Sequence, residues 1–407
     1  MIDSFCILPW VHLHIDPQGD VWPCCVMDKT GATPFGNVQK SPIIEIINSD
    51  VAKKMRTDML SGNTIKHCEV CDKNEKNKIY SYRQSVNNDR AISKDPARDT
   101  ATALTPIGND GHIDNYQPTY LDIRINNICN LKCRICSGYY SSAIDQESKT
   151  RLGDKAESYT TLTSNEKDAT LREVKKYLGT VTKIYFAGGE PLIMPEHYEI
   201  LDELVKIGRT KEVTLYYSTN FTRLSYKSKN VLDYWKKFGQ GRVVVSASLD
   251  AKGSSAEYLR HGTIWKDIEN NLKQLQKECP HVEFNIMSTV TNLGIESLIE
   301  LQQDFIVNFN LGPKTFHLQP IYHPKYLSPS SLPVRQKIRI AEKINKHIEW
   351  LLNIADSEKL VLSWKNVIDM MQVEIESDVG VVNFTKDLDN YRGEQLKTVF
   401  PQFQDLG

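Results

Sequence analysis

Three cysteines within eight residues are the part of this sequence best suited to metal chemistry. They are Cys129, Cys133 and Cys136, and they directly follow an alternating apolar run at 120–126. A loop at the end of a strand gathers such thiols, and soft thiolates in this number select an iron–sulfur cluster or zinc. Three ligands leave one iron of a four-iron cube open. The spacing therefore predicts a fourth ligand that the protein does not supply.

A second set of cysteines lies near the start of the chain: Cys6, Cys24, Cys25, Cys68 and Cys71. The stretch 9–23 alternates like a strand, turns at Pro-Gln-Gly and returns, and such a β-hairpin brings its two flanking cysteines together. We expect Cys6, Cys24, Cys68 and Cys71 to form a closed four-thiolate site. It would hold either a cluster or a structural zinc ion. Cys25 is the alternative to Cys24, although the spacing favours Cys24.

Polar groups follow several of the predicted strands. After the second strand comes Ala-Gly-Gly-Glu-Pro at 187–191, in which glycines permit close backbone approach and the carboxylate can pair with an ammonium group. Groups able to hydrogen-bond ribose hydroxyls or a carboxylate lie at the ends of the third and fourth strands or before the next helix: Ser218, Asn220, Ser246, Ser248, Asp250 and Arg260. Ordinary turns, caps and surface positions are the alternative for each of them. Residues that could face a substrate lie at the end of the last strand: His317, Gln319, Tyr322 and His323. No catalytic residue is assigned.

The cysteine loop and the Gly-Gly-Glu turn together resemble the radical S-adenosylmethionine (SAM) enzymes. The resemblance implies that Cys129, Cys133 and Cys136 hold a [4Fe-4S] cluster whose open iron binds SAM. It also implies that the segment Gly188, Gly189 and Glu190 contacts the SAM amine. The further groups after the strands would contribute SAM contacts, with Arg260 clamping the carboxylate. Ile135 departs from the aromatic residue that many members carry before the last cysteine.

The N-terminal cysteines resemble the SPASM or twitch auxiliary-cluster domain of the same enzymes. The matching stretches are Cys6-Ile-Leu-Pro-Trp10, Gly19-Asp-Val-Trp-Pro-Cys-Cys25, Gly36-Asn37 and Cys68-Glu-Val-Cys71. The spacing is similar to the shorter twitch form, which implies one auxiliary [4Fe-4S] cluster. Such a cluster has no open iron, so its implied role is to move an electron. In most relatives this domain follows the barrel, whereas here it precedes it.

The elements that must position these groups alternate between strand and helix from residue 119. Strands are predicted at 120–126, 183–187, 213–218, 242–249, 282–290 and 315–320, and helices at 164–177, 196–207, 226–238, 264–277 and 295–307. Strands separated by helices imply a parallel sheet with right-handed crossovers. Six such units predict an α/β fold with a partial (β/α)6 TIM-type barrel, whose site lies where strands pass into loops.

Four segments follow from this pattern. We expect a small cysteine-rich α+β auxiliary domain at 1–83, a linker at 84–118, the barrel at 119–330 and a helical extension at 331–407. Helices are predicted at 334–354 and around 367–375 in the extension, which has no assigned role.

Composition limits the partners. The 50 basic residues nearly balance the 51 acidic ones, so we expect no nucleic acid and no anionic membrane surface as partner. The sequence has no apolar run near twenty residues, and its first ten residues lack a basic start followed by an apolar core. Clustered cysteines in a reducing compartment favour metal binding over disulfides. We therefore expect a cytoplasmic protein without a membrane segment.

The resemblance implies an enzyme that reductively cleaves SAM to a 5′-deoxyadenosyl radical, which then abstracts hydrogen from a substrate. Modification of a peptide is the first expectation. The alternatives are a dehydrogenase of a small molecule, such as a sugar or amino-sugar alcohol, and a non-catalytic binding module stabilised by zinc. The implied partners are the substrate and an electron donor such as flavodoxin or ferredoxin.

Overall fold

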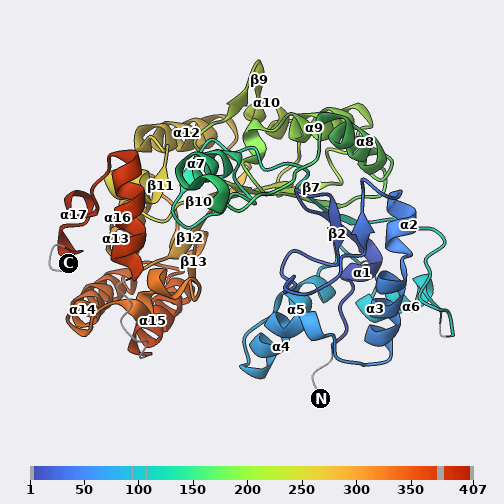
Figure 1. Cartoon of the computed structure of the whole chain (residues 1–407), viewed down its shortest axis with the longest axis horizontal. Coiled ribbons are helices and arrows are strands. Elements are labelled where there is room, and N and C mark those ends of the chain that lie inside the picture. Colours follow the sequence, from blue (N-terminus) through green and yellow to red (C-terminus); the bar gives the residue numbers. More distant parts are fainter. Residues whose placement is uncertain (1–3, 94, 107, 374–379, 404–407) are drawn as a thin grey trace.

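The fold is organised around one open sheet of nine strands. A computed structural model describes residues 4–93, 95–106, 108–373 and 380–403. Six strands run parallel in the order β13-β12-β10-β7-β6-β4, and three N-terminal strands continue the sheet as β1-β2-β3. The parallel strands are β4 (Tyr120–Ile123), β6 (Lys183–Phe186), β7 (Thr214–Thr219), β10 (Val243–Ser248), β12 (Glu283–Val290) and β13 (Phe316–Pro320). The sheet does not close, because β13 and β3 lie at opposite edges, and Figure 1 shows the resulting arch. The predicted partial barrel is confirmed.

Alternating burial explains why these segments form strands. In β10, Val243, Val245 and Ala247 are buried, whereas the residues between them are half-buried on the concave face. The outer face is covered by helices: α8 (Ser164–Lys175), α9 (Pro195–Lys206), α10 (Val231–Trp235), α12 (Trp265–Glu278) and α13 (Ile295–Asn308). Each helix buries an apolar stripe against the sheet, as α12 does with Ile268 and Leu272.

The helix predicted at 226–238 is shorter in the structure. Its first part forms a small hairpin, β8 (Ser225–Tyr226) with β9 (Lys229–Asn230), before α10 begins. Lys227 adopts a φ of 52° in the turn, a conformation incompatible with a helix. The helices α7 (Ser142–Leu152) and α11 (Gly253–Leu259) were not predicted, and both adjoin the cysteine loop or its neighbouring strand.

The N-terminal unit is joined to the barrel by backbone hydrogen bonds. The predicted hairpin is present as β1 (His12–Ile15) and β2 (Asp20–Trp22), and β3 (Gly36–Asn37) extends it. β1 also pairs in parallel with β4, so that His14 lies opposite Asp122. Around the hairpin lie α1 (Leu8–Val11), α2 (Ile43–Ile47), α3 (Asp50–Leu60), α4 (Glu69–Lys76), α5 (Tyr82–Asn87) and α6 (Ala97–Leu104).

The C-terminal extension forms helices on the side of the arch opposite the N-terminal unit (Figure 1). They are α14 (Val334–Leu351), α15 (Glu358–Gln372), α16 (Gly380–Arg392) and α17 (Leu396–Val399). The predicted helix at 334–354 corresponds to α14, and the one around 367–375 overlaps the end of α15, with 374 and 375 outside the described residues.

A buried amide ties α13 to these helices: Gln302 Oε1 accepts from Trp364 Nε1 at 2.8 Å and lies 2.8 Å from His347 Nε2. In the described part of the chain, no helix has the length and apolar character needed to cross a bilayer.

Candidate cluster and cofactor sites

The three cysteines of the loop are gathered at the carboxyl end of β4. The loop runs back through β5 (Lys132–Cys133), which pairs antiparallel with β11 (Arg260–His261). The thiols of Cys129 and Cys133 lie near enough to Cys136 for charge repulsion to raise their pKa, although burial is the largest cause. Burial raises the pKa to about 11 for Cys129 and about 12 for Cys133, so loading the site must displace the thiol protons.

Nitrogen donors surround the sulfur atoms and fit them for a thiolate-bound cluster. The backbone N–H of Leu131 lies 3.4 Å from Cys129 Sγ, and Asn220 Nδ2 lies 4.0 Å from the same atom. Arg260 Nη1 lies 3.8 Å from Cys133 Sγ. Such donors stabilise the negative charge that thiolate ligands bring to a cluster. The site therefore fits the group implied by the sequence.

The Gly-Gly-Glu turn lies directly against this loop. The backbone N–H of Glu190 donates to the carbonyl oxygen of Ile128 at 2.7 Å. Gly188 has a φ of 105°, which favours glycine, and a side chain on Gly189 would place its Cβ 2.2 Å from the Ile128 oxygen. Gly188 is therefore favoured by its backbone conformation, and Gly189 is required by the close approach of the two segments.

The Glu190 carboxylate is buried and held by three donors. It accepts from Thr219 Oγ1 at 2.7 Å, from the Asn220 backbone N–H at 2.6 Å and from the Leu192 backbone N–H at 3.1 Å. Burial nevertheless raises the pKa of Glu190 to about 7, because desolvation outweighs these bonds. A buried carboxylate of this kind can accept a proton-bearing amine.

The remaining predicted SAM contacts lie on the concave face or beside the loop. Ser218 lies opposite Ser246, and Ser248 follows on the same face of β10. The Asp250 carboxylate accepts from Arg260 Nε at 2.7 Å, and this pair lies beside Cys133. The structure thus places Asp250 and Arg260 beside the cysteine loop and the three serines on one face of the sheet, and their role as SAM contacts stays a prediction.

The N-terminal cysteines surround a second hollow. Cys6, Cys24, Cys68 and Cys71 line one hollow together with Tyr82, Arg83 and apolar residues. Within the described ranges, no set of three or more Cys, His, Asp or Glu side chains is placed to hold a single metal ion. Four thiols that line one space are the ligand set that a closed auxiliary [4Fe-4S] cluster requires.

The side chain of Cys25 faces a different environment from that of Cys24. Cys25 does not line the hollow, and its thiol lies near Asp122 and Arg124 on β4 and the residues that follow it. This supports Cys24 as the fourth ligand.

A charged group that sequence reasoning missed lies between the two sites. Asp122 is fully buried, accepts from Arg124 Nε and Nη2 at 2.7 and 2.8 Å, and pairs with His14 Nδ1 at 3.2 Å. These partners hold the pKa of Asp122 well below its usual range. Arg124 lies 5.5 Å above the ring of Tyr185, whose hydroxyl lies 2.6 Å from Ser218 Oγ. The sequence does carry a signal for this group, because Asp122 and Arg124 are two positions apart and so place two charges on one face of an otherwise apolar strand.

The predicted substrate-facing residues lie at the edge strand. His317 and Gln319 are on β13, opposite Met287 and Thr289. Tyr322 and His323 follow in an exposed loop, with Tyr322 66% exposed. The structure therefore does not bring these four residues next to the cysteine loop, and a role in substrate binding stays a prediction.

Comparison with known proteins gives two domain matches. Residues 123–304 match the model of the Radical SAM superfamily, and residues 6–72 match SPASM, an iron-sulfur cluster-binding domain. A curated relative, molybdenum cofactor biosynthesis protein 1 of Dictyostelium discoideum, is 28% identical over 196 residues, which are 47% of this chain and 28% of that protein. The chain thus spans well under a third of that relative.

Solved structures with a similar arrangement include two SAM-bound proteins. His-tagged anSMEcpe with bound AdoMet is 20% identical, with a TM-score of 0.39 over 57% of this chain and 59% of that one. SuiB of Streptococcus suis bound to S-adenosylmethionine is 17% identical, with a TM-score of 0.38 over 75% of this chain and 60% of that one.

Proposed function

Because the chain belongs to the radical SAM superfamily and carries an N-terminal iron–sulfur domain, it is an enzyme, and we propose that it abstracts hydrogen from a peptide. The non-catalytic zinc module is thereby set aside. The substrate class and the residues below are part of the proposal.

One contact carries the proposal for the site: the 2.7 Å hydrogen bond from Glu190 N–H to the Ile128 carbonyl. It fixes the Gly-Gly-Glu turn beside the loop of Cys129, Cys133 and Cys136. A cluster held by those thiolates would supply the electron for reductive cleavage of the carbon–sulfur bond of SAM. The protein contributes by holding the cofactors in place and by excluding water.

Named residues divide that work. Glu190 would accept from the amine of SAM, and the guanidinium of Arg260, which donates to Asp250 through Nε, would bind the SAM carboxylate. Ser218 and Ser246, which lie opposite each other on neighbouring strands, would hydrogen-bond the ribose hydroxyls. The auxiliary site, with four thiolates and no open position, is suited to accepting an electron as the substrate radical is oxidised.

The concave face is the place for the substrate. Because the sheet is open, an extended chain can lie across the strands without threading a closed barrel. Arg124, whose charge acts on Cys25 and whose Cβ lies beside Gly188, would meet a carboxylate of this substrate.

A small-molecule dehydrogenase is the second candidate, and the Asp122–Arg124 pair favours it, since one fixed guanidinium suits a single anionic group. An electron donor such as flavodoxin or ferredoxin completes either proposal.

Product analysis tests the proposal. Anaerobically reconstituted protein should contain about eight irons per chain, and with reductant and SAM it should release 5′-deoxyadenosine. Cys133→Ala should release none, while keeping about four irons at the auxiliary site. A colourless wild-type protein that holds zinc, or one that releases no 5′-deoxyadenosine, would refute it. To separate the two substrate classes, candidate peptides and amino-sugar alcohols are compared for their ability to stimulate release.

A further inference from the structure

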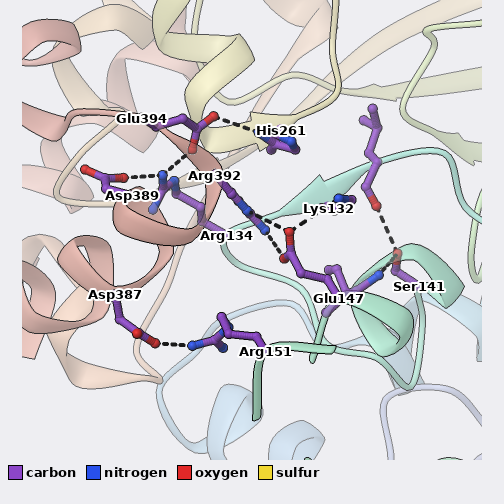
Figure 2. A network of polar contacts seen from close by, with 12 residues as sticks. Lys132, Arg134, Ser141, Glu147, Arg151, His261, Asp387, Asp389, Arg392 and Glu394 are labelled. Carbon is purple, nitrogen blue, oxygen red and sulfur yellow. Dashed lines mark hydrogen bonds and ion pairs between the residues drawn. The ribbon is translucent and has the colours of Figure 1, made fainter. Parts of the chain in front are cut away.

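The C-terminal segment 380–403 packs on the cysteine loop, from which it is separated by more than 240 residues of sequence. Figure 2 shows the polar contacts between them. An open hollow is lined by Cys133 and Cys136 on one side and by Arg392 of α16 on another, so this segment forms a wall of the space beside the cysteines.

Arg134 is the centre of these contacts, and it lies between two of the proposed ligands. Its side chain is fully buried, and its Nη2 contacts Asp389 and Glu394 of the C-terminal segment, each at 2.5 Å. The guanidinium also lies 3.7 Å from the ring centre of Tyr258, whose hydroxyl donates to Asp389 at 2.9 Å. One side chain of the loop is therefore fixed by two carboxylates and an aromatic ring.

Glu394 connects both strands of the small sheet that carries the loop. One of its carboxylate oxygens contacts Arg134, next to β5, and the other lies 2.7 Å from Nδ1 of His261 on β11. The backbone already pairs these segments, since the N–H of Arg134 donates to the Leu259 carbonyl at 2.8 Å. The carboxylate thus links the two strands from the side.

A second ion pair holds the helix that follows the loop. Arg392 donates to both carboxylate oxygens of Glu147 on α7, at 3.1 and 2.6 Å, and Lys132 on β5 lies 3.4 Å from the same carboxylate. A peripheral pair joins Arg151 to Asp387, whose side chain is 65% exposed.

Buried ion pairs such as these add little stability over a well-packed apolar contact, but breaking one leaves a charge without its partner. These ion pairs therefore favour one relative arrangement of the cysteine loop and the C-terminal segment, because any other arrangement leaves a buried charge unpaired. We infer that the C-terminal segment is a clamp that fixes the Cys133–Cys136 part of the loop in its cluster-binding geometry, with Glu394 and Arg134 as positioning residues. This inference rests on the proposed cluster ligands.

The test compares two variants that remove the same charge from the same segment. Glu394→Gln removes the link between Arg134 and His261, while Asp389 still neutralises the arginine. Asp387→Asn breaks only the exposed peripheral pair and is the matched control. Amide hydrogen exchange of the apo protein is the first measurement, because it needs no cluster.

Exchange in the segment 130–136 should be at least tenfold faster in Glu394→Gln than in wild type, and unchanged in Asp387→Asn. In reconstituted protein, Glu394→Gln should raise the dissociation constant of SAM at least tenfold and weaken the SAM-induced change in the electron paramagnetic resonance spectrum of the reduced loop cluster. The signal of the auxiliary cluster should not change, because the N-terminal unit that would hold this cluster lies on the opposite side of the arch from the C-terminal segment (Figure 1).

Equal exchange and equal SAM affinity in the two variants would overturn the clamp. A change in melting temperature without a change in SAM affinity would also overturn it, since that is the signature of a structural role alone. If wild-type protein takes up no cluster at the loop, the proposed function fails, whereas the exchange measurement still decides whether the segment fixes the loop.

Discussion

Replacing Gly189 by alanine is expected to separate the Gly-Gly-Glu turn from the cysteine loop. A Cβ at this position would lie 2.2 Å from the Ile128 carbonyl oxygen and 2.8 Å from the carbonyl carbons of Asn127 and Ile128. Both neighbours are backbone atoms, so no side-chain rotation relieves the contact. Real Cβ atoms essentially never come within 3.0 Å of another group, so the segments must move apart by roughly 0.8 Å.

The size of the effect follows from that movement. It would lengthen the 2.7 Å hydrogen bond from Glu190 N–H to Ile128 beyond the usual range, which costs about 0.5–1.5 kcal/mol. Overpacking adds about 1–3 kcal/mol. We therefore expect Gly189→Ala to lower the free energy of unfolding of the apo protein by about 1.5–4.5 kcal/mol. In reconstituted protein it should also weaken SAM binding, because the Glu190 carboxylate moves with the turn.

The control is Gly179→Ala. A Cβ there meets no atom within 4 Å, and the residue has no positive φ, so its effect should stay within about 0.5 kcal/mol. Denaturant unfolding under anaerobic, reducing conditions measures both variants, and calorimetric titration measures SAM binding. If the two variants unfold within 0.5 kcal/mol of each other and bind SAM equally, the close approach of the two segments is refuted.

Three further outcomes are expected. Gln302→Leu leaves the buried histidine and tryptophan that contact this amide without their partner, so the free energy of unfolding should fall by about 2–4 kcal/mol, whereas Gln303→Leu at a more accessible position should change it by less than about 1 kcal/mol in denaturant unfolding. Burial raises the pKa of Glu190 to about 7, and protonation removes the carboxylate charge that would accept from the SAM amine. SAM affinity should therefore fall up to about tenfold per pH unit below about pH 7 and level off above it. An affinity that stays constant between about pH 6 and 8 would contradict this role of Glu190. Cys24→Ala should lower the iron content towards about four per chain, while Cys25→Ala should keep about eight; equal losses in iron analysis would disprove the assignment of Cys24.

Local patterns in the sequence were sufficient for most of the barrel. In β10, for example, buried Val245 and Ala247 alternate with half-buried Ser246 and Ser248, and that period of two is visible without coordinates. The cysteine loop and the Gly-Gly-Glu turn were also predictable, because short segments carry their chemistry and parallel strands bring their ends to one edge. Glu190 lies against the loop as that argument requires.

Contacts between distant segments were not predictable in this way. Arg134 and Asp389 are 255 positions apart, and a charged residue beside a cysteine gives no indication of its partner. The parallel pairing of β1 with β4 was missed for a related reason: a hairpin pattern specifies the turn and its own register, but not which outer edge accepts the strand. The small hairpin at 225–230 was missed because its two-residue strands are too short to show a period.

The pairing of β1 with β4 makes the distance between the two proposed metal centres a property of one continuous sheet. A hinge between separately folded units would let that distance fluctuate, and electron tunnelling falls off steeply with separation. Here backbone hydrogen bonds join residues 12–15 of β1 to residues 120–123 of β4, which leaves little room for such fluctuation. The rate of transfer between the centres should then respond to driving force and be insensitive to solvent viscosity.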